Sequence, residues 1–336
     1  MAAEIGEESM AEPASDRITA DVTVVTATYT MDRWSMILSA VESVLHQTVL
    51  PREIILPVDH NPELFERLRE HWCSNRAHGP VITVVESEYE GHLGASETTA
   101  AERARTEFLA FLDDDASAQP DWLENLLRPF DDPSVIAVGG APLPIYAKPR
   151  PRWYPAEFNW VFGCAYAGLP TTAAPIHHLI GTTMAVRKRD VLSLGGIRSD
   201  DHGDMELSHR LLALAPGSTL IYEPRAVVHH YVAEARLSWS YFWRRCFFDN
   251  RGKVATMRDM GPAANLEAER RFVVRALTRG VARDLRQFVR GDLGGLLRAG
   301  TICVGIALAG AGYAEGTIEH ALRRRMRIDS SRPAPH

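Results

Sequence analysis

Three consecutive carboxylates, Asp113, Asp114 and Asp115, directly follow the apolar run FLAFL at residues 108–112. A short apolar run of this kind predicts a buried β-strand that ends at the triplet. Adjacent negative charges repel one another. A hard divalent cation such as Mg²⁺ or Mn²⁺ offsets that repulsion and leaves positions for diphosphate oxygens. The alternative is a solvated acidic turn, and the triplet alone does not separate the two.

Three further polar residues stand where chemistry can occur. Asp59 ends the run EIILPV, where a carboxylate can accept hydrogen bonds from a nucleobase or a ribose, although aspartate is also common in turns. Asp204 lies at the start of a predicted helix, either as a general base toward an acceptor hydroxyl or as an N-cap. His230 follows a β-like run, either as a metal ligand or as an ordinary half-buried side chain.

The elements that must position these groups alternate along the first part of the chain. Apolar patterns predict strands at 21–28, 53–58, 81–85, 108–112 and 135–139, with helices between them, one of which begins at Asn61-Pro62. This alternation predicts a mainly parallel sheet flanked by helices. Ligands of such sheets bind beyond the carboxyl ends of the strands, where Asp59 and the acidic triplet both stand.

The second part of the chain is less regular. Residues 141–175 are rich in proline and aromatic residues, which predicts an irregular segment over the sheet whose aromatics either pack there or stack on a sugar or lipid. Regular structure is predicted to return at 179–186, strands are predicted at 219–222 and 226–229, and a helix begins near Asp204. Residues 266–325 read as a helical tail with basic stretches.

In this order, the segments resemble glycosyltransferase family 2, a family of inverting enzymes with the α/β GT-A fold. The stretch VTVVTATYTMDRWSMILSAVESVLHQTVLPREIILPVD resembles the family's first strand, helix and second strand. FLAFLDDDASAQPDWLENLL resembles its DxD segment, DMELSHRL its base motif, and YEPRAVVHHY its closing strand. The resemblance covers about residues 20–255. It implies a mainly parallel mixed sheet flanked by helices, followed by a helical C-terminal appendage.

The resemblance also implies roles for particular residues. Asp59 contacts the nucleobase, usually uracil, and Thr28 and Tyr29 lie near the nucleotide, as does Asp114. The outer carboxylates Asp113 and Asp115, together with His230, hold Mg²⁺ or Mn²⁺, and Asp204 is the candidate base.

Two departures from the family pattern leave alternatives open. The family often carries Arg-Asn in the helix before the DxD segment, where this chain has Glu97 and Thr98, so one nucleotide contact is either lost or supplied by Arg103. Gly203 stands where the base motif often has glutamate. Glu206 is therefore an alternative base, and Asp200 and Asp201 are weaker ones.

A basic and aromatic segment, LSWSYFWRRCFFDNRGKV, follows the closing strand. Its arginines Arg244 and Arg245 are candidate diphosphate ligands because guanidinium groups bind such oxygens through two hydrogen bonds. The alternative is an amphipathic surface helix with solvated arginines.

Composition limits the class of protein. The formal net charge of −6 over 336 residues argues against a nucleic-acid partner. The four cysteines are scattered, which argues against a disulfide framework. We expect a disordered leader at 1–20, a GT-A domain at 21–255, a helical region at 256–326 and a disordered tail at 327–336. The uncharged run 299–314 predicts either a buried helix with close glycine packing or an element at a membrane surface.

The expected activity is the transfer of a sugar from a nucleotide-sugar donor, with UDP as the expected nucleotide, by a metal-assisted single displacement. Three acceptors remain open: a glycan, a polyprenyl phosphate or a small molecule. The expected location is the cytoplasm or the inner face of the cell membrane, with peripheral membrane contact. The alternatives are a non-catalytic nucleotide-sugar-binding protein and a sugar-nucleotidyltransferase, although the first loop, TATYTMDRWS, lacks the glycines usual in the latter.

Overall fold

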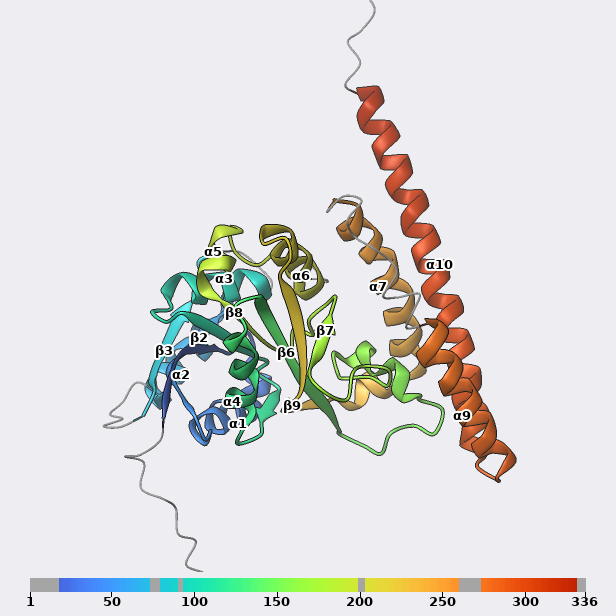
Figure 1. The fold of residues 1–336 in the computed structure, drawn as a ribbon, viewed down its shortest axis with the longest axis horizontal. Helices are drawn as coiled ribbons and strands as arrows, with labels where there is room; N and C mark the ends of the chain where they lie inside the picture. The colour runs from blue at the N-terminus through green and yellow to red at the C-terminus, as the bar shows by residue number, and fades with distance from the viewer. Residues whose placement is uncertain (1–17, 73–78, 90–92, 199–202, 260–272, 331–336) are drawn as a thin grey trace, which may run out of the picture.

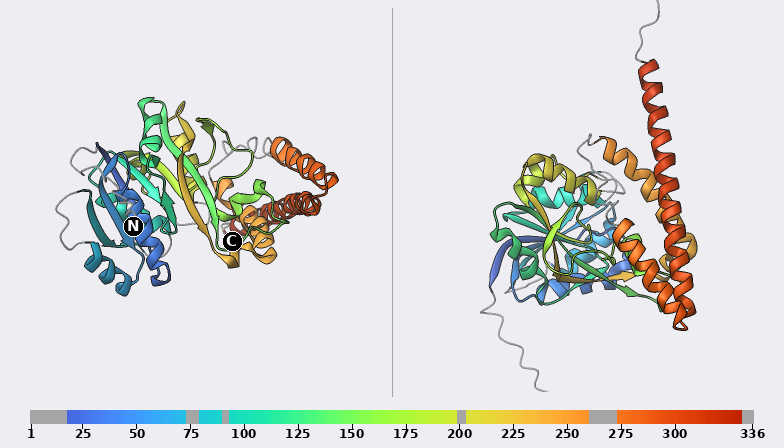
Figure 2. Two further views of the ribbon diagram at one scale, coloured as in Figure 1. Left: turned by 90° about the horizontal axis from the view of Figure 1, so that it is seen from below. Right: turned by 45° about the vertical axis from the view of Figure 1, so that its right-hand side comes forward.

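The computed structural model describes residues 18–72, 79–89, 93–198, 203–259 and 273–330 (Figure 1). A curled mixed sheet forms the centre, with helices on both of its faces, and the described C-terminal helices lie at one side (Figure 2). The fold predicted from the sequence, a mixed sheet flanked by helices with a helical C-terminal region, is confirmed. The expected leader at 1–20 lies largely outside the described residues.

The sheet has the strand order β3-β2-β1-β4-β8-β6-β9-β5, and β7 pairs with β9. Strands β1 to β4 are mutually parallel, whereas β8 lies antiparallel between β4 and β6. The bounds are β1 Thr19–Val25, β2 Leu50–Val58, β3 Val81–Glu86, β4 Phe108–Leu112, β5 Ala116–Ala118, β6 Val135–Tyr146, β7 Ala174–Ile176, β8 Thr183–Arg187 and β9 Thr219–Val232.

Helices cover the two faces of the sheet in two groups. Because successive strand residues point to opposite faces, Val24 and Val25 enter different core clusters. One cluster packs under α1 (Trp34–Leu45), α2 (Pro62–Trp72) and α4 (Trp122–Leu127), which lie below the sheet in Figure 1. The other packs under α3 (Leu93–Arg103), α5 (Lys188–Ser193) and α6 (Gly203–Leu214), which lie above it.

Local signals account for several boundaries. The Oδ1 atom of Asn61 accepts a hydrogen bond from the backbone N–H of Leu64 at 3.1 Å, and α2 begins at Pro62, as predicted. Two strands are longer than predicted. β6 continues to Tyr146, into the segment expected to be irregular, and β9 is one strand of 14 residues where two were expected.

The C-terminal region packs on an aromatic cluster. It comprises α7 (Trp239–Asp259), η5 (Val273–Leu277), α9 (Thr278–Val289) and α10 (Leu293–Ser330). The 3₁₀ segment η3 (Ala156–Phe162) supplies Phe158 and Phe162 to a buried cluster with Phe242 of α7 and Ile302 of α10. Most aromatics of the 141–175 segment therefore form core. α7 runs continuously through the expected domain boundary at 255/256.

Glycines on one side of α10 allow it to lie against α7 at very close range. A Cβ atom at Gly312 would overlap the carbonyl oxygen of Phe247, and one at Gly316 would overlap that of Arg251. The close glycine packing predicted from the sequence is thus present on this side of the helix.

We expect Gly312→Ala to destabilise the protein, whereas Gly310→Ala, on the same helix, should be neutral or stabilising. A Cβ atom at Gly310 meets no atom of the described residues within 4 Å, so alanine there gains up to about 1 kcal/mol of helix propensity. At Gly312 the same gain is outweighed by displacement of α10 from α7. Urea unfolding of both variants measures the difference, and equal stabilities would contradict the packing described.

A buried network of charges ties η3 to the C-terminal helices. Glu157 is 2% exposed and its Oε1 atom lies 2.9 Å from Nη1 of Arg283. Asp284 is fully buried and pairs with Arg283 at 2.9 Å and with Arg298 at 3.2 Å. Each buried carboxylate therefore has a guanidinium partner, as buried charges require.

Candidate active site

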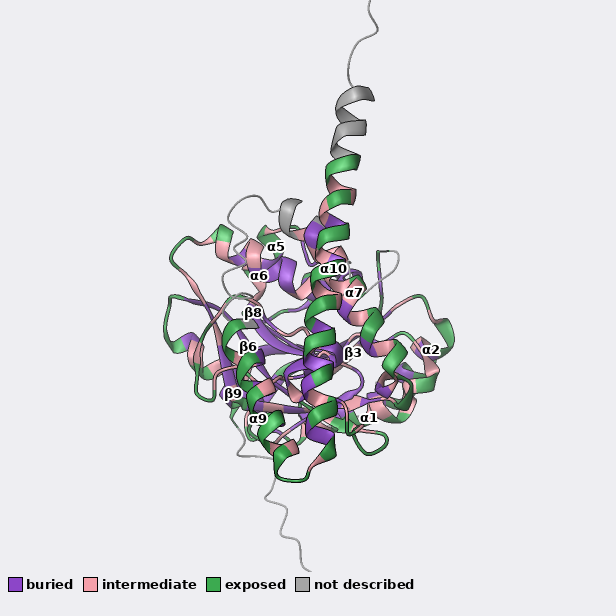
Figure 3. Ribbon diagram, turned by 90° about the vertical axis from the view of Figure 1, so that its right-hand side faces the viewer, coloured by how far each residue is buried: buried purple, intermediate pink, exposed green. Residues whose placement is uncertain are grey.

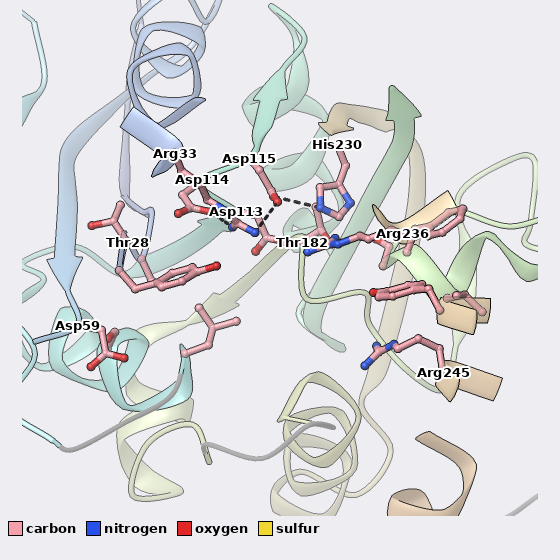
Figure 4. A pocket seen from close by; sticks show the side chains of 18 residues that line it. Thr28, Arg33, Asp59, Asp113, Asp114, Asp115, Thr182, His230, Arg236 and Arg245 are labelled. Carbon is pink, nitrogen blue, oxygen red and sulfur yellow. Dashed lines mark hydrogen bonds and ion pairs between the residues drawn. The ribbon is translucent and has the colours of Figure 1, made fainter. Parts of the chain in front are cut away.

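A cavity of about 510 Å³ opens at the carboxyl ends of β1, β2 and β4 (Figure 4). This is the edge of the sheet at which the sequence predicted a ligand site. The residues that line it are Ala27, Thr28, Tyr29, Arg33, Asp59, Leu93, Ser96, Asp113, Asp114, Asp115, Val161, Phe162, Gly163, Thr182, His230, Arg236, Tyr241 and Arg245.

Backbone pairing beyond β1 and β2 positions the first group of these residues. The N–H of Thr28 donates to the carbonyl of Pro57 at 2.9 Å, and the N–H of Asp59 donates to the carbonyl of Thr28 at 2.8 Å. A further bond, 2.6 Å long, joins Oδ1 of Asp59 to Nδ1 of His60, whose backbone is left-handed at φ 46°. The structure thus brings Thr28, Tyr29 and Asp59 to one wall of the cavity.

The acidic triplet is held between three strands. Asp113 donates its N–H to the carbonyl of Thr182 just before β8, at 3.2 Å, and the carbonyl of Asp115 accepts from the N–H of Tyr231 in β9, at 2.9 Å. Ala116 of β5 pairs with His230 of β9, which sets the imidazole beside Asp115. The triplet and the histidine, 115 positions apart along the chain, therefore meet through strand register.

Asp113, Asp115 and His230 form a cluster suited to a metal ion. One ligand atom from each residue can be chosen so that all three lie within 4.8 Å of one another, and Nε2 of His230 is 3.0 Å from Oδ1 of Asp115. Two carboxylates and one imidazole are a donor set that Mg²⁺ or Mn²⁺ accepts. The residues present therefore fit the ion expected from the sequence.

Cys164 fixes the orientation of the His230 ring. Its Sγ atom lies 3.3 Å from Nδ1 of His230, so that Nε2 faces the carboxylates. Burial alone would lower the pKa of His230. The hydrogen bonds to Asp115 and Cys164 and the charge of Asp113 outweigh burial and raise that pKa to about 10. Without metal, the imidazolium itself balances the acidic cluster.

We expect the affinity for Mn²⁺ alone to rise close to tenfold per pH unit between about pH 6 and 8, because the ion must displace the His230 proton. The proton is held up to a pKa of about 10, so the displacement applies across this whole range. Calorimetry in two buffers of different ionisation enthalpy should show about one proton released per ion bound. His230→Gln should lower that release, and a pH-independent affinity in the parent protein would contradict the assignment.

Arg33 is a cavity residue that the sequence analysis missed. It follows the turn residue Thr30, and its Nη atoms lie 2.5 Å from Oδ1 of Asp114 and 3.1 Å from Oδ2 of Asp115. Burial raises the pKa of Asp114 to about 7, and the Arg33 charge opposes this only in part. The Oδ2 atom of Asp114 finds no hydrogen-bond partner among the described residues. Arg33 could have been predicted from the sequence, because a buried acidic triplet needs a positive charge beside it.

Two more arginines line the opposite wall. Arg236 follows β9, and Arg245 of α7 pairs with Asp249 at 3.1 Å. Arg244 is exposed on α7 and stands outside the described cavity wall. Figure 4 shows Arg33, Arg236 and Arg245 around the space beside the acidic triplet.

Asp204 lies behind the cavity wall, at the first turn of α6. Its Oδ2 atom accepts from the N–H of Gly181 at 3.0 Å, and Gly181 precedes the lining residue Thr182. Glu206 is 2% exposed and pairs with Arg198 and Arg210 at 3.2 and 3.3 Å. Neither carboxylate lines the described cavity, so the choice of base between them stays a prediction. Asp200 and Asp201 lie outside the described residues.

Glu97 occupies the position where the resemblance expects Arg-Asn. Its side chain is buried, and burial, reinforced by the charges of Asp113 and Asp204, raises its pKa well above the usual range. Arg103 pairs with Glu88 on the surface and does not line the described cavity. The structure therefore gives no support to a nucleotide contact from Arg103.

Comparisons with known proteins agree with this architecture. Residues 23–195 match the family described as Glycosyl transferase family 2. The chain is 30% identical over 244 residues to the glucosyl-dolichyl phosphate glucuronosyltransferase of Haloferax volcanii, which covers 69% of this chain and 76% of that relative.

Solved glycosyltransferases share the fold at low identity. The mannosyltransferase PcManGT from Pyrobaculum calidifontis, solved with GDP-Man and Mn²⁺, is 18% identical with a TM-score of 0.52, over 94% of this chain and 84% of its own. GalNAc-T7, solved with UDP, GalNAc and Mn²⁺, is 15% identical with a TM-score of 0.51, over 81% of this chain and 58% of its own. With the family match over half of the chain, the protein is a glycosyltransferase that belongs to glycosyltransferase family 2.

Proposed function

We propose that this chain transfers a sugar from a UDP-sugar, with inversion at the anomeric carbon, to a hydroxyl of a lipid-linked sugar phosphate. One observation supports the proposed donor. Asp59, the Asp113–Asp115–His230 cluster and three arginines (Arg33, Arg236 and Arg245) lie in one cavity. A nucleoside diphosphate offers a base for the first group and anionic oxygens for the others.

Different cavity residues would contact different parts of the donor. Asp59, with Thr28 and Tyr29 beside it, accepts hydrogen bonds from the base, which suits the N–H of uracil. Asp113, Asp115 and His230 would hold Mg²⁺ or Mn²⁺, which supplies neutralisation of the diphosphate charge. Arg236 and Arg245 add guanidinium groups on the opposite wall, where two parallel hydrogen bonds can orient a phosphate.

In the proposed reaction Asp204 takes the proton of the acceptor hydroxyl while that oxygen attacks the anomeric carbon. The bond from this carbon to the diphosphate oxygen breaks in the same step, and the nucleoside diphosphate leaves as an anion facing the arginines. A single displacement from the opposite side inverts the configuration of the sugar. The Gly181 amide orients the Asp204 carboxylate for this role.

The acceptor class rests on a relative and on the shape of the C-terminal region. The Haloferax protein is named for glucosyl-dolichyl phosphate, a sugar on a lipid phosphate. In this chain α7, which contributes Tyr241 and Arg245 to the cavity, also packs against the apolar helix α10. A lipid-linked acceptor is consistent with both observations, and a position at a membrane surface follows from such an acceptor.

The test is a transfer assay with UDP- and GDP-sugars, with and without Mn²⁺, on a short-chain polyprenyl phosphate glucose. We expect Mn²⁺-dependent release of UDP and, by proton NMR, a product of inverted anomeric configuration. Retained configuration would overturn the single displacement, and faster turnover of GDP-sugars would overturn the role given to Asp59. Transfer to free glucose at the same rate would overturn the lipid-linked acceptor.

A further inference from the structure

The outer side of α10 is an apolar surface that the other described residues leave open. Residues 293–322 of this helix are long and apolar enough to cross a membrane by length and composition, yet only 33% of the most apolar stretch is buried. Every exposed residue of α10 between 296 and 314 is uncharged, and Leu296, Leu297, Val304 and Ile306 are the large ones. Figure 3 shows this exposed side running along the helix.

The neighbouring helix α9 adds apolar side chains and positive charge to the same region. Val289 is 84% exposed and Leu285 is 42% exposed. Arg279, Arg286 and Arg290, all exposed, are spaced by seven and four residues and therefore share one side of the helix. The acidic residue of α9, Asp284, is fully buried among arginine partners. The exposed charge of α9 is thus positive, although the whole chain carries −6.

The other side of α10 packs against the protein. Gly312 and Gly316 bring the helix against the backbone of α7. Glu315 and Glu319 both pair with Arg251 of α7, at 3.4 and 2.8 Å, so Arg251 offsets part of their charge. A helix that crossed a bilayer would exchange these partners for lipid, leaving glycine backbone and two carboxylates in hydrocarbon. The packed arrangement is compatible with a helix that lies along a membrane instead.

We propose that the exposed sides of α9 and α10 dock in the plane of an anionic lipid surface, with Leu296, Val304 and Val289 entering the acyl boundary and the α9 arginines contacting lipid phosphates. Basic amphipathic helices bind membranes in this way. A second copy of the chain fits less well, because a two-fold contact brings the same patch, arginines included, against itself. The inference adds to the proposed membrane position by naming the docking surface and the charge of its lipid, and docking itself needs neither donor nor turnover.

The first test is flotation of the full chain with vesicles of phosphatidylcholine containing about 30 mol% phosphatidylglycerol. We expect binding to these vesicles and much weaker binding to pure phosphatidylcholine. The double variant Leu296→Glu/Val304→Glu should bind at least about tenfold less, because it removes two apolar side chains from the acyl boundary and adds two negative charges near anionic lipid. Arg286→Glu/Arg290→Glu should lose the preference for anionic lipid.

Matched controls keep the result specific. Val81→Glu changes a residue that is 64% exposed on the edge strand β3, and Arg189→Glu reverses a charge whose side chain is 78% exposed on α5. Both should bind vesicles like the parent chain. Binding of UDP with Mn²⁺ in the absence of lipid should be unchanged in all variants, so a failure of docking is distinguishable from a failure of the donor site. Parent protein that does not float overturns the proposal.

The second test separates a helix in the membrane plane from one that crosses it. In a Cys73→Ser/Cys303→Ser background, Leu296→Cys and Ala311→Cys each place one fluorophore on the outer side of α10, because Cys164 and Cys246 are buried. Quenching by brominated lipids should report the same shallow depth at both positions. A crossing helix would separate the two depths by about 22 Å, which would overturn the proposal.

Light scattering completes the set of outcomes. We expect a monomer without lipid. A parent dimer that Leu296→Glu/Val304→Glu converts to a monomer, together with no vesicle binding, would assign the surface to a second copy of the chain and overturn the lipid proposal.

Discussion

Asp204→Asn is expected to lower kcat by about 10²–10⁴-fold while the affinity for the nucleotide-sugar donor stays nearly unchanged. The factor is the usual contribution of a positioned general base. Asparagine keeps an oxygen that can accept from the N–H of Gly181, so the first turn of α6 should remain in place. Steady-state kinetics with saturating acceptor measures kcat, and calorimetry with UDP and Mn²⁺ measures binding.

Glu206→Gln is the matched control for that experiment, since it changes the neighbouring carboxylate of the same helix. Its charge balances Arg198 and Arg210, so we expect lower thermal stability and a kcat within about twofold of the parent. Full activity of Asp204→Asn, or a loss of kcat in Glu206→Gln that exceeds that of Asp204→Asn, would move the role of base away from Asp204.

Asp115→Asn is expected to weaken binding of Mn²⁺ at least about 100-fold and to lower kcat/KM by a similar factor. Even residues that only support metal ligands cost 10–100-fold when changed, and Asp115 is a proposed ligand. The substitution also removes the first hydrogen bond that raises the pKa of His230, so this pKa should fall from about 10. Titration of the imidazole by NMR checks the second effect without any turnover.

Asp114→Asn tests whether Asp114 differs from the proposed metal ligand Asp115, its neighbour in the triplet. Asp114 is 3% exposed and is held by Arg33, and burial raises its pKa to about 7. We therefore expect binding of Mn²⁺ alone to survive in Asp114→Asn. Equal losses of metal affinity in the two variants would contradict the assignment of Asp113, Asp115 and His230 as the ligand group.

The parts of the fold set by local pattern were predictable. β4 was placed at its observed bounds because five apolar residues end at a polar triplet, and α2 begins at the predicted Asn-Pro signal. The antiparallel course of β8 between β4 and β6 was not foreseen, because the direction of a strand depends on tertiary contacts that no short segment encodes. The length of β9 was missed because a glutamate and a proline interrupt its apolar pattern.

The site, like the fold, was predictable where local sequence patterns position its residues. The sequence indicated Asp59, Asp113, Asp115 and His230, each at or near a strand end, and the structure brings them into one cavity. Arg33 and Arg236 were missed because short 3₁₀ helices after β1 and β9 position them, at Met31–Arg33 and Glu234–Leu237. Helix periodicity could have shown which of Arg244 and Arg245 lines the cavity. Tyr241 and Arg245 are four residues apart, so they share one side of the helix, and both line the same wall.

The ion pair between Glu157 and Arg283 links the C-terminal helices to the wall of the cavity. Removing these helices would therefore affect the cavity. Glu157 stands in η3, the segment that contributes Val161 and Phe162 to the cavity wall. A recombinant chain trimmed before α9 to improve its handling would strand this buried carboxylate without its guanidinium, at a cost of about 3–5 kcal/mol. The wall beside the acidic triplet would then loosen, even though every proposed donor-binding residue was still present.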